Sequence, residues 1–139
     1  MSDFNHHIAT DLPHDFFYMD IDGTAYKNDT KILRVMESKR ENERVTDGQK
    51  TQLPLYATML HLMVQHGFVH EQSGVLLIRN IANVYTEATV TRVLPFTGQF
   101  VMSKPVYATG ELLRSLEGAR RVDGDVWQRL SEPAKSVSI

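Results

Sequence analysis

The stretch FFYMDIDGTAY, residues 16–26, decides how the fold of this chain is interpreted. Apolar and polar side chains alternate along it, and Asp20 and Asp22 fall on the same side of the alternation. A repeat of two residues is typical of a β-strand with one buried face. The stretch therefore predicts a strand whose polar face carries both carboxylates.

A second alternating stretch, residues 32–39, follows the first after the turn-forming segment KNDTK. A parallel crossover needs a dozen or more residues, so a connection this short predicts an antiparallel hairpin. The period of two places Glu37 and Lys39 on one face of the second strand, and the hairpin could bring Asp22 beside them.

A helix is expected after the charged segment 40–49, which contains Gly48 and is interpreted as a loop. From Thr51 to His66, apolar residues recur every three or four positions, as on one face of a helix. Thr51 is the expected N-cap, because this choice places Pro54 in the first turn, where proline is tolerated.

The expected element order is strand, strand, helix, strand, strand, helix, which is typical of an α/β domain. Gly67 is the expected end of the central helix. The remaining strands and one or two C-terminal helices are expected at residues 74–81, 87–96, 111–121 and 126–134. Residues 1–15 are expected to form an N-terminal arm or a short helix.

Length and composition predict one domain spanning residues 1–139, since the chain is 42% hydrophobic and 23% charged. A formal net charge of -2 argues against a generally basic nucleic-acid-binding surface, although a local basic site needs no overall excess. The chain has no cysteine, which excludes disulfides and thiolate metal sites. No apolar run is long enough to span a membrane and no signal-peptide pattern is present, so a cytoplasmic location is expected.

Asp22, Glu37 and Lys39 together have the chemistry that phosphodiester hydrolysis requires. Carboxylate oxygens hold Mg²⁺ or Mn²⁺, which acidifies water and offsets the charge on the phosphate. A lysine beside them can orient the attacking water or stabilise the pentacoordinate oxygens. Glu37 and Lys39 alone would also fit an ordinary surface ion pair, so the pair by itself is a weak signal.

A third motif makes the combination more specific. The three motifs stand in the order Asp22, Glu37-Ser38-Lys39 and Gln52-Leu-Pro-Leu-Tyr56. Residues 17–65 thereby resemble the PD-(D/E)XK nuclease superfamily, specifically its RecB-like branch. That branch has an Asp on one strand, (D/E)-x-K on the next and a helix that begins Q-L-x-L-Y-A.

The resemblance implies a restriction-endonuclease-like α/β core, with a mixed central sheet flanked by helices. It implies Mg²⁺- or Mn²⁺-dependent hydrolysis of DNA by activated water, without a covalent intermediate, as in DNA repair or recombination. Asp22 and Glu37 match the metal ligands and Lys39 matches the catalytic lysine. A homo-oligomer or a larger DNA-processing complex is left open, because a domain this small offers duplex DNA little surface.

Further roles follow from the same resemblance. Gln52 is expected to assist the nucleophile or the phosphate, and the carbonyl of Ser38 to serve as an extra metal ligand. Substrate contacts are expected from Tyr56, Gln49 and Arg40. The chain departs from the family in its short N-terminal segment, where His6, His7 and His14 are the candidates for the metal-touching residue that the family has there.

Two other classes stay open. The run ending in Asp20-x-Asp22-Gly-Thr also resembles the nucleophile strand of haloacid-dehalogenase-type phosphatases, with Asp20 as nucleophile and Asp22 as general acid/base. That fold needs a parallel sheet with crossover helices, for which the connection to residues 32–39 is too short. The other class is a non-catalytic member of the nuclease fold that binds nucleic acid.

Overall fold

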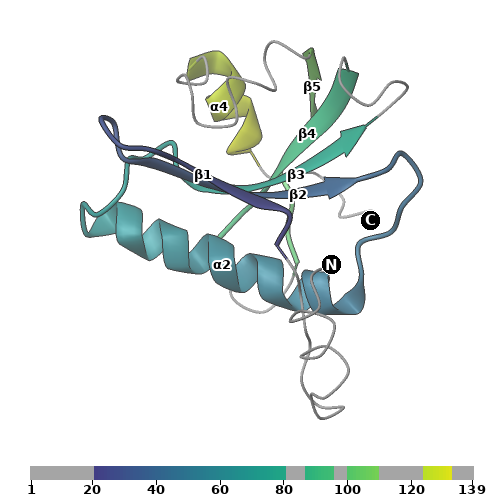
Figure 1. Ribbon diagram of the computed structural model, residues 1–139, viewed down its shortest axis with the longest axis horizontal. Helices are drawn as coiled ribbons and strands as arrows, with labels where there is room; N and C mark the ends of the chain where they lie inside the picture. The colour runs from purple at the N-terminus through teal and green to yellow at the C-terminus, as the bar shows by residue number, and fades with distance from the viewer. Residues whose placement is uncertain (1–20, 81–86, 96–99, 110–123, 133–139) are drawn as a thin grey trace.

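A computed structural model of the protein describes residues 21–80, 87–95, 100–109 and 124–132. Its described strands form one mixed sheet in the order β1-β2-β3-β4-β5, with α2 on one face and α4 on the other (Figure 1). The elements are β1 (Gly23–Lys27), β2 (Ile32–Lys39), α2 (Asp47–Gln65), β3 (Gly74–Asn80), β4 (Glu87–Val93), β5 (Val106–Thr109) and α4 (Gly124–Leu130). The expected α/β fold with a mixed sheet and helices is confirmed.

The first two strands form the expected antiparallel hairpin, in which Gly23 lies opposite Met36. Lys31, with φ of 64°, completes the turn between them. Strand β1 begins only at Gly23, so Asp22 directly precedes it, whereas the expected strand began at residue 16. Residues 16–20, including Asp20, lie outside the described residues, as does the N-terminal segment with its histidines.

Helix α2 connects the two parallel strands of the sheet, β2 and β3, whose register places Glu37 beside Leu77 and Lys39 beside Arg79. β3, β4 and β5 then follow one another as antiparallel neighbours. A helix that links parallel neighbours starts near the carboxyl end of the first strand and covers one face of the sheet. The first turn of α2 therefore lies over the end of β2.

The start of α2 corrects the sequence prediction. Thr46, and not Thr51, is the N-cap, and it forms a capping box with Gln49. The segment 40–49 is therefore a loop only as far as the cap, and Gly48 lies in the first turn. Pro54 lies inside the helix, where it is buried against the sheet, so this burial and the capping box outweigh the lost helical hydrogen bond.

The other end of α2 agrees with the prediction. The helix ends at Gln65, His66 caps it, and Gly67 follows with φ of +76°. Glycine adopts this left-handed conformation without a steric penalty, which explains why the helix stops here. None of the helices in the described ranges is long and apolar enough to cross a membrane.

Each face of the sheet has its own hydrophobic core. Under α2, Leu53, Ala57 and Leu60 pack against side chains of the sheet that include Val35 and Val75. On the opposite face, Leu76 and Val90 pack against Trp127 and Leu130 of α4. This division follows from the period of two along each strand.

Some expected boundaries differ from those observed. β4 ends at Val93 and α4 begins at Gly124, and strand β5 was not expected from the sequence. β5 has only four residues, and its pairing with the end of β4 sets its place. The helix expected at residues 111–121 lies outside the described residues, as do residues 81 and 96 of the expected strands.

Candidate active site

The candidate site lies where β2 ends beneath the start of α2. Glu37 and Lys39 continue the row of Val35 on the face that α2 covers, and their side chains are only 5% and 4% exposed. Burial of a carboxylate or an ammonium group is costly unless partners compensate for it. The contacts of these two side chains therefore decide what the site can do.

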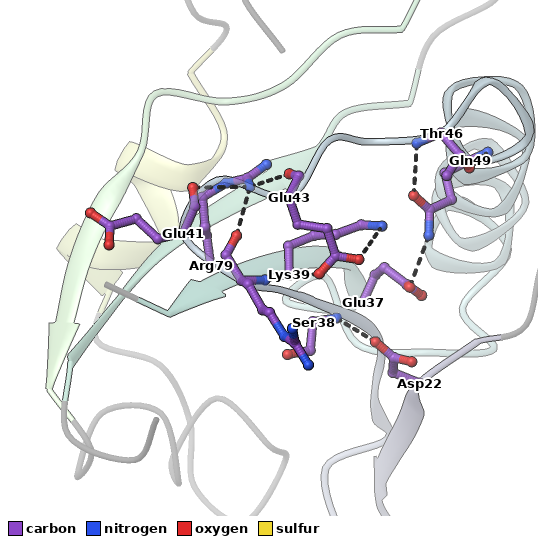
Figure 2. A network of polar contacts seen from close by, with 10 residues as sticks. Asp22, Glu37, Ser38, Lys39, Glu41, Glu43, Thr46, Gln49 and Arg79 are labelled. Atoms are coloured by element: carbon purple, nitrogen blue, oxygen red, sulfur yellow. Dashed lines mark hydrogen bonds and ion pairs between the residues drawn. The ribbon is translucent and has the colours of Figure 1, made fainter. Parts of the chain in front are cut away.

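Asp22 joins Glu37 from the neighbouring strand, as the hairpin predicts. Its Oδ2 accepts a hydrogen bond from the backbone N–H of Ser38 at 2.7 Å (Figure 2). The antiparallel register continues one step past Gly23 and Met36, so the two carboxylates become neighbours across the strands. The structure thus brings together two predicted site residues that are far apart in sequence.

The carboxyl group of Glu37 is held on one oxygen only. Oε1 accepts a hydrogen bond from Nε2 of Gln49 at 3.0 Å, whereas Oε2 is buried and has no hydrogen-bond partner within the described part of the chain. Burial raises the pKa of Glu37 to about 7, and the negative charge of Asp22 adds to this, while the Asp22 backbone N–H and Lys39 oppose it. The neighbouring carboxyl groups of Asp22 and Glu37 are therefore suited to binding a cation.

Gln49 links this carboxyl group to the helix cap. Its side-chain oxygen accepts the N–H of Thr46 at 3.0 Å, and its amide nitrogen donates to Glu37. Gln49 was expected to contact substrate, but its observed contacts fix Glu37 relative to α2. The T-x-x-Q spacing of a capping box could have revealed this role from the sequence.

Gln52 and Tyr56, the two residues of the helix motif, differ in their surroundings. Gln52 is half-buried, one turn beyond Gln49. Tyr56 is partly buried and packs against the core between α2 and the sheet. The assisting role of Gln52 and the substrate contact of Tyr56 remain predictions.

Lys39 is paired with a residue that the sequence did not single out. Its Nζ lies 3.5 Å from Oε2 of Glu43, and Oε1 of Glu43 accepts the backbone N–H of Arg40 at 3.1 Å. This backbone hydrogen bond is the main cause of the lowered pKa of Glu43, with Lys39 contributing. Glu43 therefore remains charged and holds the ammonium group over the end of β2 (Figure 2).

Arg79 fixes the loop that carries Glu43. It lies beside Lys39 on β3, and its Nη1 donates to the backbone carbonyls of Arg40, Glu41 and Glu43. These hydrogen bonds satisfy the three carbonyls and restrict movement of the loop. The side chain of Arg40, predicted to contact substrate, is exposed beside this network.

The donor set can be tested against a hard divalent cation. Within the described ranges, no three His, Asp or Glu side chains gather into a metal-binding group. Mg²⁺ commonly takes only one or two carboxylates and completes its shell with water. Asp22 and Glu37 supply that number, and Oε2 of Glu37, which has no hydrogen-bond partner in the described part of the chain, is an oxygen donor of the kind that Mg²⁺ prefers, so these residues fit the cation.

Comparisons with protein-family models, with curated proteins and with solved structures found no match. The site therefore rests on its own geometry. The antiparallel pairing of β1 with β2 also bears on the phosphatase alternative, which needs a parallel neighbour joined through a helix at this position.

Proposed function

We propose that the protein is a metal-dependent nuclease that hydrolyses DNA phosphodiester bonds, with a site of the PD-(D/E)XK type. The observation that carries the proposal is the buried carboxyl group of Glu37 beside the exposed carboxyl group of Asp22, with Lys39 on the same face of β2. Two acids pressed together at one end of a sheet, next to a lysine, are a costly arrangement that a bound cation would stabilise.

Each residue has a defined part in this reaction. Asp22 and Glu37 would hold Mg²⁺ or Mn²⁺, with the Ser38 carbonyl as an additional ligand. The cation's contribution when bound is Lewis acidity, which favours hydroxide formation and offsets phosphate charge. Lys39 donates hydrogen bonds to the phosphate oxygens as negative charge develops on them. Gln49 keeps Glu37 oriented, and Glu43 positions the amine of Lys39.

Cleavage of linear and circular plasmid DNA, with Mn²⁺ or with EDTA, tests the proposal. We expect cleavage with Mn²⁺ that EDTA abolishes, and no turnover of a small aryl phosphate. Asp22→Asn should weaken metal binding, so part of its defect should recover at high Mn²⁺. Asp29→Asn, on the exposed hairpin turn, is the matched control and should cut normally.

Two results would replace this proposal. Efficient aryl-phosphate turnover that is lost in Asp20→Asn would indicate the phosphatase. A wild-type protein that cuts nothing with any divalent metal, yet binds DNA equally well in all variants, would indicate the non-catalytic nucleic-acid-binding member of the fold.

A further inference from the structure

A hollow lies beside the candidate site, on the same face of the sheet. The register places Lys39, Arg79 and Thr89 in one row across β2, β3 and β4, and Glu37, Leu77 and Thr91 in the next row. The hollow has a volume of about 430 Å³, and its floor includes the β3 and β4 members of both rows. Neighbouring strands lie about 4.8 Å apart, so the hollow begins one strand away from Lys39.

One wall of the hollow is held in place by hydrogen bonds from Arg79. It is the loop of residues 41–44, which Arg79 fixes through three backbone carbonyls. Met102 and Pro105 also line the hollow. Ligand pockets are largely formed before the ligand binds, and a loop tied down by an arginine meets that condition.

The lining suits a neutral, flat ligand with polar edges. Leu77, Met102 and Pro105 offer apolar surface, and Thr89 and Asn42 offer hydrogen-bonding groups. Apolar walls with a few polar groups are typical of sites for small organic ligands. A nucleobase combines a stacking face with a hydrogen-bonding edge, so it fits this combination.

Charge sets the orientation of such a ligand. The carboxylates of Glu41 and Glu43 line the hollow together with Arg44 and Arg79, so the hollow has no excess of positive charge to attract a phosphate. Lys39 and the exposed Arg40 lie on the side of the metal-binding carboxylates. A nucleotide would therefore place its phosphate toward Lys39 and its base and sugar in the hollow.

We propose that this hollow is a subsite for one nucleoside, the base and sugar of the nucleotide adjoining the phosphate that is cut. The assignment to a cleaved strand rests on the proposed function, whereas binding of a nucleoside in the hollow does not. A volume at the lower end of the range of ligand pockets, roughly 300–1,000 Å³, suits one nucleoside and not a stack of several bases.

Titration of the ¹⁵N-labelled protein with deoxyadenosine 5′-monophosphate tests the subsite. The backbone amides of Leu77, Thr89 and Thr91 should shift, and deoxyadenosine without phosphate should shift the same amides. Inorganic phosphate and deoxyribose 5-phosphate should not. Shifts with phosphate alone, or no shifts with the nucleotide, would overturn the assignment.

A variant within the hollow tests whether the proposed subsite contributes to DNA cleavage. Thr89→Trp should fill the hollow and weaken nucleotide binding at least about tenfold. On DNA it should raise KM while kcat changes by less than about threefold. Gln128→Trp, exposed on α4 at the opposite face of the sheet, is the matched control and should bind and cut as the wild type does.

The outcomes separate the two proposals. If Thr89→Trp binds the nucleotide as tightly as the wild type, the subsite is wrong, whatever the cleavage assay gives. If the nucleotide binds in the hollow but DNA is never cut, the subsite stands and the nuclease proposal fails. If DNA is cut with unchanged KM in Thr89→Trp, the nuclease stands without this subsite.

Discussion

Strand β2 carries buried charged side chains on both of its faces, and Arg34 on one face and Glu37 on the other are accommodated in different ways. On the α4 face, the guanidinium of Arg34 is fully buried and lies 5.3 Å from the ring centroid of Trp127. Burial lowers its pKa to about 10, so it stays charged at neutral pH. On the α2 face, burial and Asp22 raise the pKa of Glu37 to about 7, so its charge is lost near neutral pH.

The partners explain the difference. Arg92 lies 4.6 Å from the same Trp127 ring and donates a hydrogen bond to Ser131, so the indole stabilises two cations at once. The Nε atom of Arg92 is buried and has no hydrogen-bond partner among the described residues, yet its guanidinium group remains stacked on the Trp127 ring. Glu37 has instead a second acid beside it, and its Oε2 has no hydrogen-bond partner among the described residues. The like charges on the α4 face share an aromatic ring, whereas the acid pair on the α2 face leaves Oε2 of Glu37, an oxygen of the type that binds Mg²⁺, without a hydrogen bond within the described residues.

The largest effect is expected from Lys39→Ala. In the proposed mechanism the variant loses a positive charge that stabilises the transition state but keeps both carboxylates, so the cleavage rate should fall about a hundredfold or more, with DNA affinity little changed. Single-turnover cleavage and DNA binding measure the two quantities. Lys27→Ala, on the partly exposed ion pair of β1, is the control. Equal loss of affinity and rate would make Lys39 a binding residue.

A somewhat smaller effect, on stability alone, is expected at the opposite face. Trp127→Leu leaves a cavity and removes the ring that stacks on two guanidinium groups, so the free energy of unfolding should fall by about 2–3 kcal/mol. Urea denaturation measures it. Cleavage by the folded variant should stay within about twofold of wild type. A selective loss of cleavage would mean that the α4 face also serves the site.

The third prediction concerns pH and uses Glu37→Gln in EDTA. The unfolded state releases the Glu37 proton near the ordinary pKa of 4.5, and the folded state only near 7. Wild-type stability should therefore fall between these values as pH rises, by about 3 kcal/mol. Glu37→Gln lacks this loss, so its stability relative to wild type should increase from pH 5 to pH 8. A difference independent of pH would mean that Glu37 is ionised in the usual range.

The smallest effect is expected at the helix cap that orients Glu37 through Gln49. Thr46→Ala removes the acceptor for the Gln49 N–H and should lower the free energy of unfolding by about 1 kcal/mol. Thr51→Ala changes a threonine inside the helix, where alanine is a better helix former, and should cost almost nothing. The same urea experiment measures both. The reverse order would restore Thr51 as the N-cap.

Local sequence patterns predicted much of the fold. Alternation gave β1 and β2, the short connection gave their antiparallel pairing, and Gly67 marked the end of α2. These features depend on neighbouring residues in the chain, so a period or a turn motif is sufficient. The sequence prediction places the start of α2 at Thr51 because Pro54 favours a first-turn position, whereas the capping box of Thr46 and Gln49 sets the observed start.

The sequence by itself determined which ionisable residues share a strand face, since a period of two follows from backbone geometry. Asp22, Glu37 and Lys39 could be nominated on that basis. Only the tertiary structure decided which partners they meet, because Gln49, Glu43 and Arg79 reach the site through a crossover helix, a loop and a parallel neighbour. The raised pKa of Glu37 arises from burial and from Asp22 across the hairpin, and both exist only once the chain has folded.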